Sequence, residues 1–165
     1  MPAPSSPPEN RPLSGVRVLD FTRVLAGPYC TAMMADLGAE VIKIEAPHGD
    51  DYRHIGPFQE GESLLFQAVN RGKRSIALDL KQAEAIETVK ALLADCDVLI
   101  ENFRPGVLTR LGLGYEALSQ ANAKLVYCSI SGYGQSGPYS KKGAFDVTVQ
   151  GMSGLMSVTG APGMA

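Results

Sequence analysis

The sequence has little of what metal sites, disulfide scaffolds and hydrolase triads require. Its 165 residues include no tryptophan, two histidines and three cysteines. Cys30, Cys96 and Cys128 are odd in number and widely spaced, which matches neither a disulfide framework nor a zinc pattern. His48 and His54 share a polar segment with no cysteine nearby, which is typical of surface histidines. We therefore expect small core cysteines in a reduced, cytoplasmic protein, with no bound metal.

The sequence also lacks a strong excess of positive or negative charge and a long apolar run. The formal net charge of −2 gives no general attraction to nucleic acid or to a membrane surface. No segment approaches the roughly 18 consecutive apolar residues that a membrane span needs. Residues 1–12 contain five prolines and no apolar stretch, which is typical of a disordered tail rather than a signal peptide. Neither nucleic acid nor membrane is therefore expected as a partner.

What the chain does contain is a globular composition, 45% apolar, with strand and helix patterns in alternation. The β-rich segments are 16–21, 41–45, 75–80, 97–101 and 125–130. Helical patterns follow Pro28 and occupy about 82–94, 115–121 and 145–155, and a polar loop is expected over 46–74. This order predicts an α/β fold, a Rossmann-like open and mostly parallel sheet with helices on both faces.

The segment 97–106 is the most informative part of the chain. A buried strand over 97–101 is followed at once by Asn102, Phe103 and Arg104. Ligands of open parallel sheets bind beyond the carboxyl ends of the strands. An amide, an apolar ring and a guanidinium suit a ligand with a phosphate part and a ring or thioalkyl part. The alternative is structural: an N-cap, a core phenylalanine and a solvated arginine before a Pro-Gly turn.

The string Gly-x-Gly-x-x-Gly at 132–137 matches a dinucleotide fingerprint, but its context does not. The mechanism requires the last glycine to open a helix that holds the pyrophosphate. Residues 138–143 follow instead and have the composition of a loop, and the string comes after the fifth strand rather than the first. The glycines are better explained by a tight turn or a close approach to a ligand.

Five segments in order carry a family resemblance. They are 12–28, 36–47, 70–81, 101–115 and 126–138. Together they resemble the class III coenzyme A transferase family, which includes formyl-, carnitine- and succinyl-type coenzyme A transferases and 2-methylacyl-coenzyme A racemases. The resemblance begins near residue 12 and continues to the last residue.

The resemblance implies a Rossmann-like large domain, a smaller domain inserted later, and two subunits that interlock as a homodimer. Chains of the family are much longer than this one. Residues 13–165 are therefore expected to be an incomplete Rossmann-like coenzyme A-binding domain, the amino-terminal part of such a subunit without the small domain. Coenzyme A and acyl-coenzyme A are the implied substrates, with a carboxylic acid as acceptor and no tightly bound cofactor.

The resemblance also implies site residues, position by position. Leu25 and Ala26 occupy family positions that contact coenzyme A after the first strand, although some transferases have glutamine in place of Leu25. Ala46 replaces an arginine that holds phosphate in some members, so that contact is missing. The remaining implied coenzyme A contacts are Leu78, Asp79, Leu80, Lys81, Asn102, Phe103, Arg104 and the phosphate-binding Arg110.

The segment Gly143, Ala144, Phe145 and Asp146 is the most diagnostic part of the resemblance and is implied to border the acyl and coenzyme A site. Racemase-like members carry a proton-transferring histidine at the position of Phe145. Phenylalanine transfers no proton, so racemisation is disfavoured. Asp146 is then either a supporting catalytic carboxylate in the acyl pocket or the N-cap of the last helix.

The implied reaction transfers coenzyme A between carboxylic acids through a mixed anhydride on an aspartate. The family's nucleophilic aspartate follows the position of Asp146 and is expected beyond Ala165. Two other hypotheses stay open. One is a non-catalytic fragment or binding module, and the other is a 2-methylacyl-coenzyme A racemase-like enzyme.

Overall fold

The computed structural model describes residues 11–161 and residue 163. The expected tail, residues 1–12, lies mostly outside the described residues; Arg11 donates its backbone N–H to the Ser14 hydroxyl at 3.1 Å. Contacts divide the chain into two units, Met1–Ile130 and Ser131–Ala165. No helix of the described part is long and apolar enough to cross a membrane.

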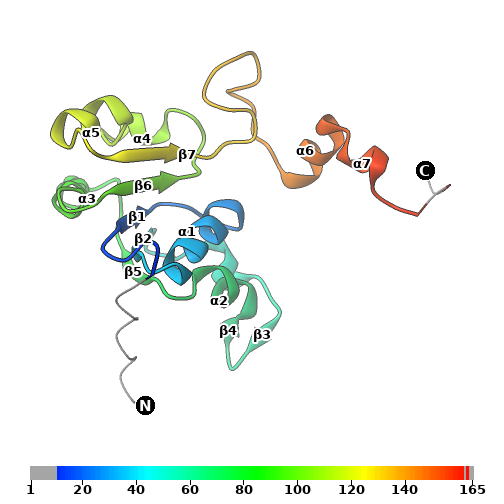
Figure 1. Ribbon diagram of the computed structural model, residues 1–165, viewed down its shortest axis with the longest axis horizontal. Helices are drawn as coiled ribbons and strands as arrows, with labels where there is room; N and C mark the ends of the chain where they lie inside the picture. Colours follow the sequence, from blue (N-terminus) through cyan, green and yellow to red (C-terminus); the bar gives the residue numbers. More distant parts are fainter. Residues whose placement is uncertain (1–10, 162, 164–165) are drawn as a thin grey trace. The chain divides into compact units, whose positions relative to one another are not determined.

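A five-stranded sheet in the order β5-β2-β1-β6-β7 forms the centre of the first unit (Figure 1). Its strands are β1 (Arg17–Asp20), β2 (Glu40–Glu45), β5 (Arg74–Ala77), β6 (Val98–Glu101) and β7 (Val126–Ser129). Every neighbouring pair is parallel. The chain moves from β1 through β2 to β5 and then crosses to β6 on the other side of β1. The strand order therefore reverses beside β1, which is where open α/β sheets bind ligands.

Helices pack on both faces of this sheet. They are α1 (Ala26–Asp36), α3 (Ala83–Leu93), α4 (Val107–Arg110) and α5 (Tyr115–Ala121). α1 packs with Val18 and Ile100, whereas α3, α4 and α5 pack around Leu19 and Leu99. Successive side chains of a strand point to opposite faces, so adjacent residues of β1 and β6 belong to different cores. The predicted α/β fold with a mostly parallel sheet is confirmed.

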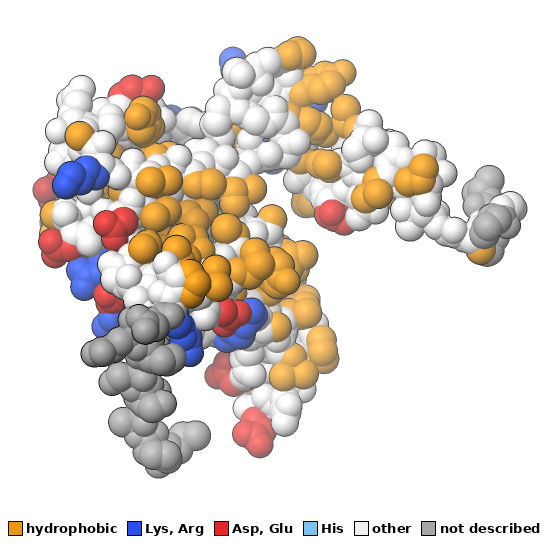
Figure 2. All heavy atoms as spheres, viewed as in Figure 1, with side chains coloured by type: hydrophobic (Ala, Val, Ile, Leu, Met, Phe, Trp, Pro, Cys, Tyr) orange, Lys and Arg blue, Asp and Glu red, His pale blue; other side chains and the backbone are white. Residues whose placement is uncertain are grey.

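α1 presents a second apolar ridge to solvent. Tyr29, Met33 and Leu37 follow one another at a spacing of four residues and are between 42% and 51% exposed. Residues at this spacing share one side of a helix. Figure 2 shows hydrophobic side chains gathered on the face of the unit where α1 lies.

The polar loop predicted over 46–74 is wrong in part, because this segment contains regular structure. It holds a 3₁₀ helix η1 (Asp51–His54), a hairpin of β3 (Phe58–Gln59) and β4 (Glu62–Ser63), and the helix α2 (Leu64–Asn70). The Ser63 hydroxyl caps α2 by accepting the Phe66 N–H at 3.2 Å. α2 then packs against α1. These elements are too short to show a clear hydrophobic period in the sequence.

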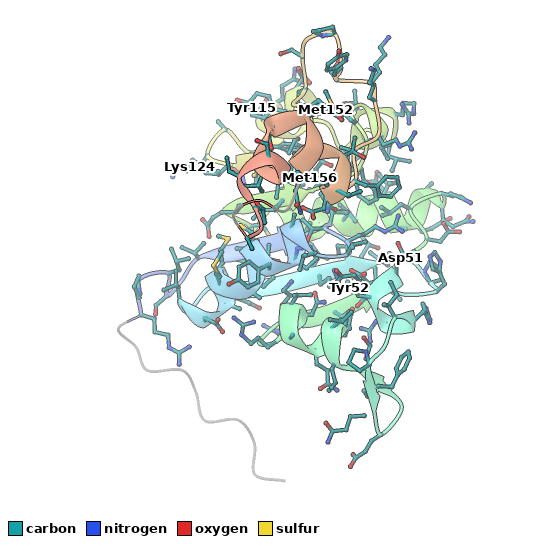
Figure 3. All side chains as sticks on the ribbon, turned by 90° about the vertical axis from the view of Figure 1, so that its right-hand side faces the viewer. Asp51, Tyr52, Tyr115, Lys124, Met152 and Met156 are labelled. Atoms are coloured by element: carbon teal, nitrogen blue, oxygen red, sulfur yellow. The ribbon has the colours of Figure 1, made fainter. Side chains whose placement is uncertain are left out.

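The second unit contains α6 (Asp146–Ser153) and α7 (Leu155–Val158), where one amphipathic stretch over 145–155 was predicted. Gly154 separates them in a left-handed conformation, with φ of 80°. Met152 and Met156 lie on the two helices (Figure 3). Asp146 is the first residue of α6 and accepts a hydrogen bond from the Gln150 side chain. Phe145 occupies the N-cap position, so the alternative that Asp146 is the N-cap is wrong.

Candidate functional site

A cavity of about 350 Å³ lies beyond the carboxyl ends of β1, β2, β5 and β6. Each strand contributes the residues that follow it, and α4 closes one side. The lining residues are Phe21, Thr22, Arg23, Lys43, Ile44, Glu45, Ala46, Pro47, Gly49, Asp50, Leu78, Asp79, Leu80, Lys81, Phe103, Val107, Arg110 and Leu111. This is the edge of the sheet at which the sequence predicted a ligand.

The segment 78–81 forms one wall of the cavity. β5 ends at Ala77, and the Leu78 N–H still donates to the Glu45 carbonyl oxygen at 2.8 Å. The Asp79 carboxylate then accepts the Lys81 N–H at 3.1 Å, a turn that leads into α3. Leu78 and Leu80 pack against the core of the sheet. The predicted residues of this segment therefore line one cavity together.

Phe103 and Arg110 form the opposite wall, from the loop after β6 and from α4. The Phe103 N–H donates to the buried Glu101 carboxylate at 2.8 Å, which fixes the turn after the strand. Gly106 precedes α4 with φ of 82°, a conformation that favours glycine. The Phe103 ring packs partly on the core, and Arg110 is exposed.

Four of the predicted residues of the first unit do not line this cavity. Leu25 and Ala26 are exposed at the start of α1. Arg104 is exposed in the turn before α4. Asn102 directs its side-chain amide at the backbone of Arg23, accepting the N–H and donating to the carbonyl oxygen at 2.8 Å each.

The predicted residues Gly143, Ala144, Phe145 and Asp146 belong to the second unit. A Cβ atom on Gly132 would lie 2.0 Å from the Ala144 Cβ, so this close approach requires glycine. Gly132, the first glycine of the Gly-x-Gly-x-x-Gly string, therefore serves local packing, a role that the sequence did not predict.

Two cationic side chains of the cavity, Lys81 and Arg110, have no carboxylate partner among the described residues. Neither Lys81 nor Arg110 forms an ion pair with any residue between 11 and 161. Arg23 is paired with Asp51, which lies beside Tyr52 in η1 (Figure 3). Free guanidinium and ammonium groups at a partly apolar cavity are suited to phosphate oxygens.

Sequence reasoning missed three ion pairs in and next to the cavity wall. Asp20–Lys73 and Lys43–Asp50 are buried, and the third joins the buried Glu45 to the partly exposed Arg53. The sequence did contain a sign of these ion pairs, because Asp20, Lys43 and Glu45 are charged residues inside strands whose other residues are typical of a buried strand. Charged side chains in such strands must find partners, and the sequence alone does not say which.

Asp20, at the end of β1, is fully buried and accepts four hydrogen bonds. They come from the Thr22 N–H at 2.8 Å, the Thr22 hydroxyl at 2.5 Å, the Thr31 hydroxyl at 2.6 Å and the Lys73 ammonium at 3.0 Å. Lys73 also donates to the Pro28 carbonyl oxygen at 2.9 Å. This carboxylate joins the loop after β1 to the start of α1 and to the segment before β5.

Glu45, at the end of β2, has its pKa lowered to about 2. Burial opposes ionisation, but it is outweighed by hydrogen bonds from the Arg53 guanidinium, the Ser75 hydroxyl and the Asp50 N–H. Arg53 reaches both carboxylate oxygens at 2.7 Å, and the Asp50 N–H donates at 2.9 Å. The ionised form of Glu45 therefore holds the segment 45–53 in place.

We expect the stability of the first unit to fall in acid through Glu45. Its pKa is lower in the folded chain than the ordinary 4.5, so its contribution is full above the ordinary value and is lost as pH falls toward about 2. The shift corresponds to about 3 kcal/mol of unfolding free energy. Urea unfolding between about pH 6 and pH 2 measures the loss, which Glu45→Gln removes from the pH profile. Glu87→Gln, at an exposed position of α3, is the control; a Glu45→Gln chain with the original profile would contradict the assignment.

Residues 13–165 match the sequence model of a family described as CoA-transferase family III. The chain is 52% identical to the succinyl-CoA:glutarate CoA-transferase of Mus musculus over 152 residues, which is 91% of the chain and 35% of that protein. It is 51% identical to the succinate–glutarate CoA-transferase of Agrobacterium fabrum (strain C58 / ATCC 33970) over 164 residues, 94% of the chain and 41% of that protein.

A solved structure is similar over the same part. The crystal structure of a CAIB/BAIF family protein from Brucella suis superposes with a TM-score of 0.89 and 47% sequence identity, and the match covers 94% of this chain and 42% of that one. The chain thus spans between 35% and 42% of the length of these relatives.

Proposed function

This chain belongs to CoA-transferase family III, and on that premise we propose that it supplies the coenzyme A-binding part of an enzyme that transfers coenzyme A between carboxylic acids. The observation that carries the proposal is the cavity at the carboxyl edge of the sheet. It brings together the segment 78–81, Phe103 and Arg110, which the family resemblance implies as coenzyme A contacts.

The chemistry of the cavity suits the nucleotide end of this carrier. Phe103, Leu78 and Leu80 offer apolar surface for the adenine ring, while Arg110 and Lys81 offer charged donors for phosphate oxygens. The adenine ring would then be buried against apolar side chains, and the phosphates would form ion pairs at the rim of the cavity. Asn102 and Arg104 belong to the same loop as Phe103, and we propose that Leu25 and Ala26, which follow β1, contact another part of the carrier.

The relatives point to dicarboxylic acids as donor and acceptor. The two curated transferases described above are named for succinate and glutarate. We propose that this protein acts on acids of the same class, as a cytoplasmic, interlocked homodimer of the kind the family resemblance implies. Coenzyme A is then a substrate rather than a resident cofactor.

The proposed reaction proceeds through an aspartyl anhydride. The aspartate carboxylate attacks the thioester carbonyl, the carbon–sulfur bond breaks, and the coenzyme A thiolate leaves but stays bound. A carboxylate is a suitable nucleophile because the anhydride is as activated as the thioester. The carboxylate of the second acid attacks the aspartyl carbonyl of the anhydride and expels the first acid as a carboxylate. The bound thiolate then attacks the acyl carbonyl of the new anhydride, which remakes the thioester and frees the aspartate. We place this aspartate outside residues 1–165, with Asp146 as a supporting carboxylate and Phe145 as a residue that transfers no proton.

Calorimetric titration of the purified chain with coenzyme A tests the proposal. We expect binding without turnover of succinyl-coenzyme A and labelled glutarate. Arg110→Gln should weaken binding by about 10- to 100-fold, because it removes a charge-assisted hydrogen bond to phosphate.

Lys124→Gln is the matched control, since it also removes one positive charge. Lys124 lies two residues before the strand β7, at the amino end of the sheet (Figure 3), and does not line the cavity. No heat at millimolar coenzyme A, or an Arg110→Gln chain that binds like the original, would contradict the proposed site. Full acyl exchange by the chain itself would contradict only the placement of the nucleophile.

A further inference from the structure

The loop after β1 is held by side chains from other parts of the first unit. Asn102, beyond the end of β6, forms two hydrogen bonds with one residue of this loop: its Oδ1 accepts the Arg23 N–H and its Nδ2 donates to the Arg23 carbonyl oxygen, both at 2.8 Å. An amide side chain that pairs with both backbone groups of one residue fixes the position and the orientation of that peptide segment.

The two residues that flank Arg23 are held in the same way by a buried ion pair. The Lys43 ammonium donates to the Thr22 carbonyl oxygen at 2.7 Å and lies 2.9 Å from the Asp50 carboxylate. The Asp50 carboxylate accepts the Val24 N–H at 3.2 Å. Both charged side chains are only 1% exposed, so these bonds are shielded from water. We call Lys43, Asp50 and Asn102 the loop clamp.

The conformation of the loop explains why a clamp is needed. Val24 has φ of 68°, in the left-handed region that a β-branched residue rarely adopts and that costs about 1–3 kcal/mol. Thr22 also packs closely on the first turn of α1, where a Cβ atom on Gly27 would lie 2.3 Å from the Thr22 Cβ. Such a backbone persists only when surrounding contacts determine it.

We propose that the loop clamp is a positioning device for coenzyme A. It sets the backbone of residues 22–24, which carries Thr22 and Arg23 in the cavity wall and leads directly to Leu25 and Ala26. Asn102 thus acts through Arg23 rather than by touching the ligand, consistent with its place outside the cavity lining. The inference rests on the proposed function and assigns a role in it to Lys43 and Asp50, which the family resemblance does not mark.

Two readouts on the full 165-residue chain test the clamp: the dissociation constant for coenzyme A and amide hydrogen exchange at Arg23 and Val24. Asn102→Leu removes both hydrogen bonds without leaving a buried charge. We expect it to raise the dissociation constant about tenfold and to speed exchange at the two amides. Asn102→Asp keeps the acceptor for the Arg23 N–H and should show a smaller loss of affinity.

A second variant tests the ion pair of the loop clamp, Lys43 and Asp50. Lys43→Met combined with Asp50→Leu removes the pair together, so that no charge is buried alone. Because both side chains also line the cavity, weaker binding alone does not decide between positioning and direct contact. Faster exchange at Arg23 and Val24 is the expected result, and unchanged exchange would refute the role of this pair. The control is Val89→Ala, which creates a void in the core beside α3 at a residue that does not line the ligand cavity. It should lower stability but leave the affinity and the exchange at Arg23 and Val24 unchanged.

The outcomes separate this inference from the proposed function. If the original chain fails to bind coenzyme A, the proposed function fails and the clamp's role fails with it. If the original chain binds and the clamp variants bind equally well, only the clamp is refuted. Weaker binding by Asn102→Leu with unchanged exchange at Arg23 and Val24 would also refute it, because Asn102 would then contact the ligand directly.

Discussion

Lys73→Met is expected to destabilise the first unit by about 3–5 kcal/mol, the cost of leaving one partner of a buried ion pair alone. The Lys73 side chain is 2% exposed and its partner Asp20 is fully buried. Burial lowers the pKa of Lys73 although Asp20 opposes the shift, so the pair does not recover all of its desolvation cost. The large effect of Lys73→Met therefore comes from leaving the Asp20 carboxylate buried without a partner, rather than from the loss of its attraction to Lys73.

Urea unfolding followed by near-ultraviolet circular dichroism measures this loss. The matched variant replaces both partners, Lys73→Met with Asp20→Leu, and should recover much of the stability because no charge remains buried. The neighbouring ion pair Arg71–Asp36 is about half exposed, and Arg71→Met should cost less than about 1 kcal/mol. Equal losses in Lys73→Met and Arg71→Met would refute the assignment.

Phe21→Ala is expected to cost about 3–5 kcal/mol and to weaken coenzyme A binding as well. Phe21 is 1% exposed, immediately follows β1, belongs to the larger core and also lines the cavity. Removing its ring leaves a void between the sheet and the site, and the wall of the cavity loses its support. Thermal unfolding and calorimetric titration of the same chain measure the two effects.

Leu118→Ala separates the two effects of the Phe21 variant. Leu118 belongs to the same core cluster but does not line the cavity. We expect a loss of about 2–5 kcal/mol with coenzyme A affinity unchanged. Phe21→Leu keeps much of the buried volume and should lose less stability than Phe21→Ala. If Leu118→Ala weakens binding as much as Phe21→Ala, the effect on binding is only a consequence of lower stability.

Elements with a strong period were predictable from the sequence. Val89 and Leu93 repeat on one side of the segment 82–94, and the structure buries both in a helix over 83–93. The helix predicted at 115–121 has the observed bounds, and the apolar strand at 97–101 appears as β6 with one residue fewer. In each case burial of one apolar side decides the local conformation, and that side is visible in the sequence.

Elements stabilised by a few specific contacts were not predictable in the same way. α2 depends on the cap at Ser63 and on its packing against α1, which joins residues far apart in sequence. The strand expected to continue to residue 80 ends at Ala77, where residues 78–81 turn into the cavity wall. Short segments of this kind follow their tertiary surroundings rather than their own propensity.

The parallel α/β class, the family and the edge of the sheet at which Phe103, Arg110 and residues 78–81 meet could all be read from the sequence. The two hydrogen bonds between Asn102 and the backbone of Arg23, and the pairing of Lys43 with Asp50 in the cavity wall, became visible only in the folded chain. The difference lies in how far apart in the sequence the interacting residues are. The hydrophobic period of a segment is visible in its own residues. A buried polar group instead pairs with whichever group the packed strands bring within hydrogen-bond distance.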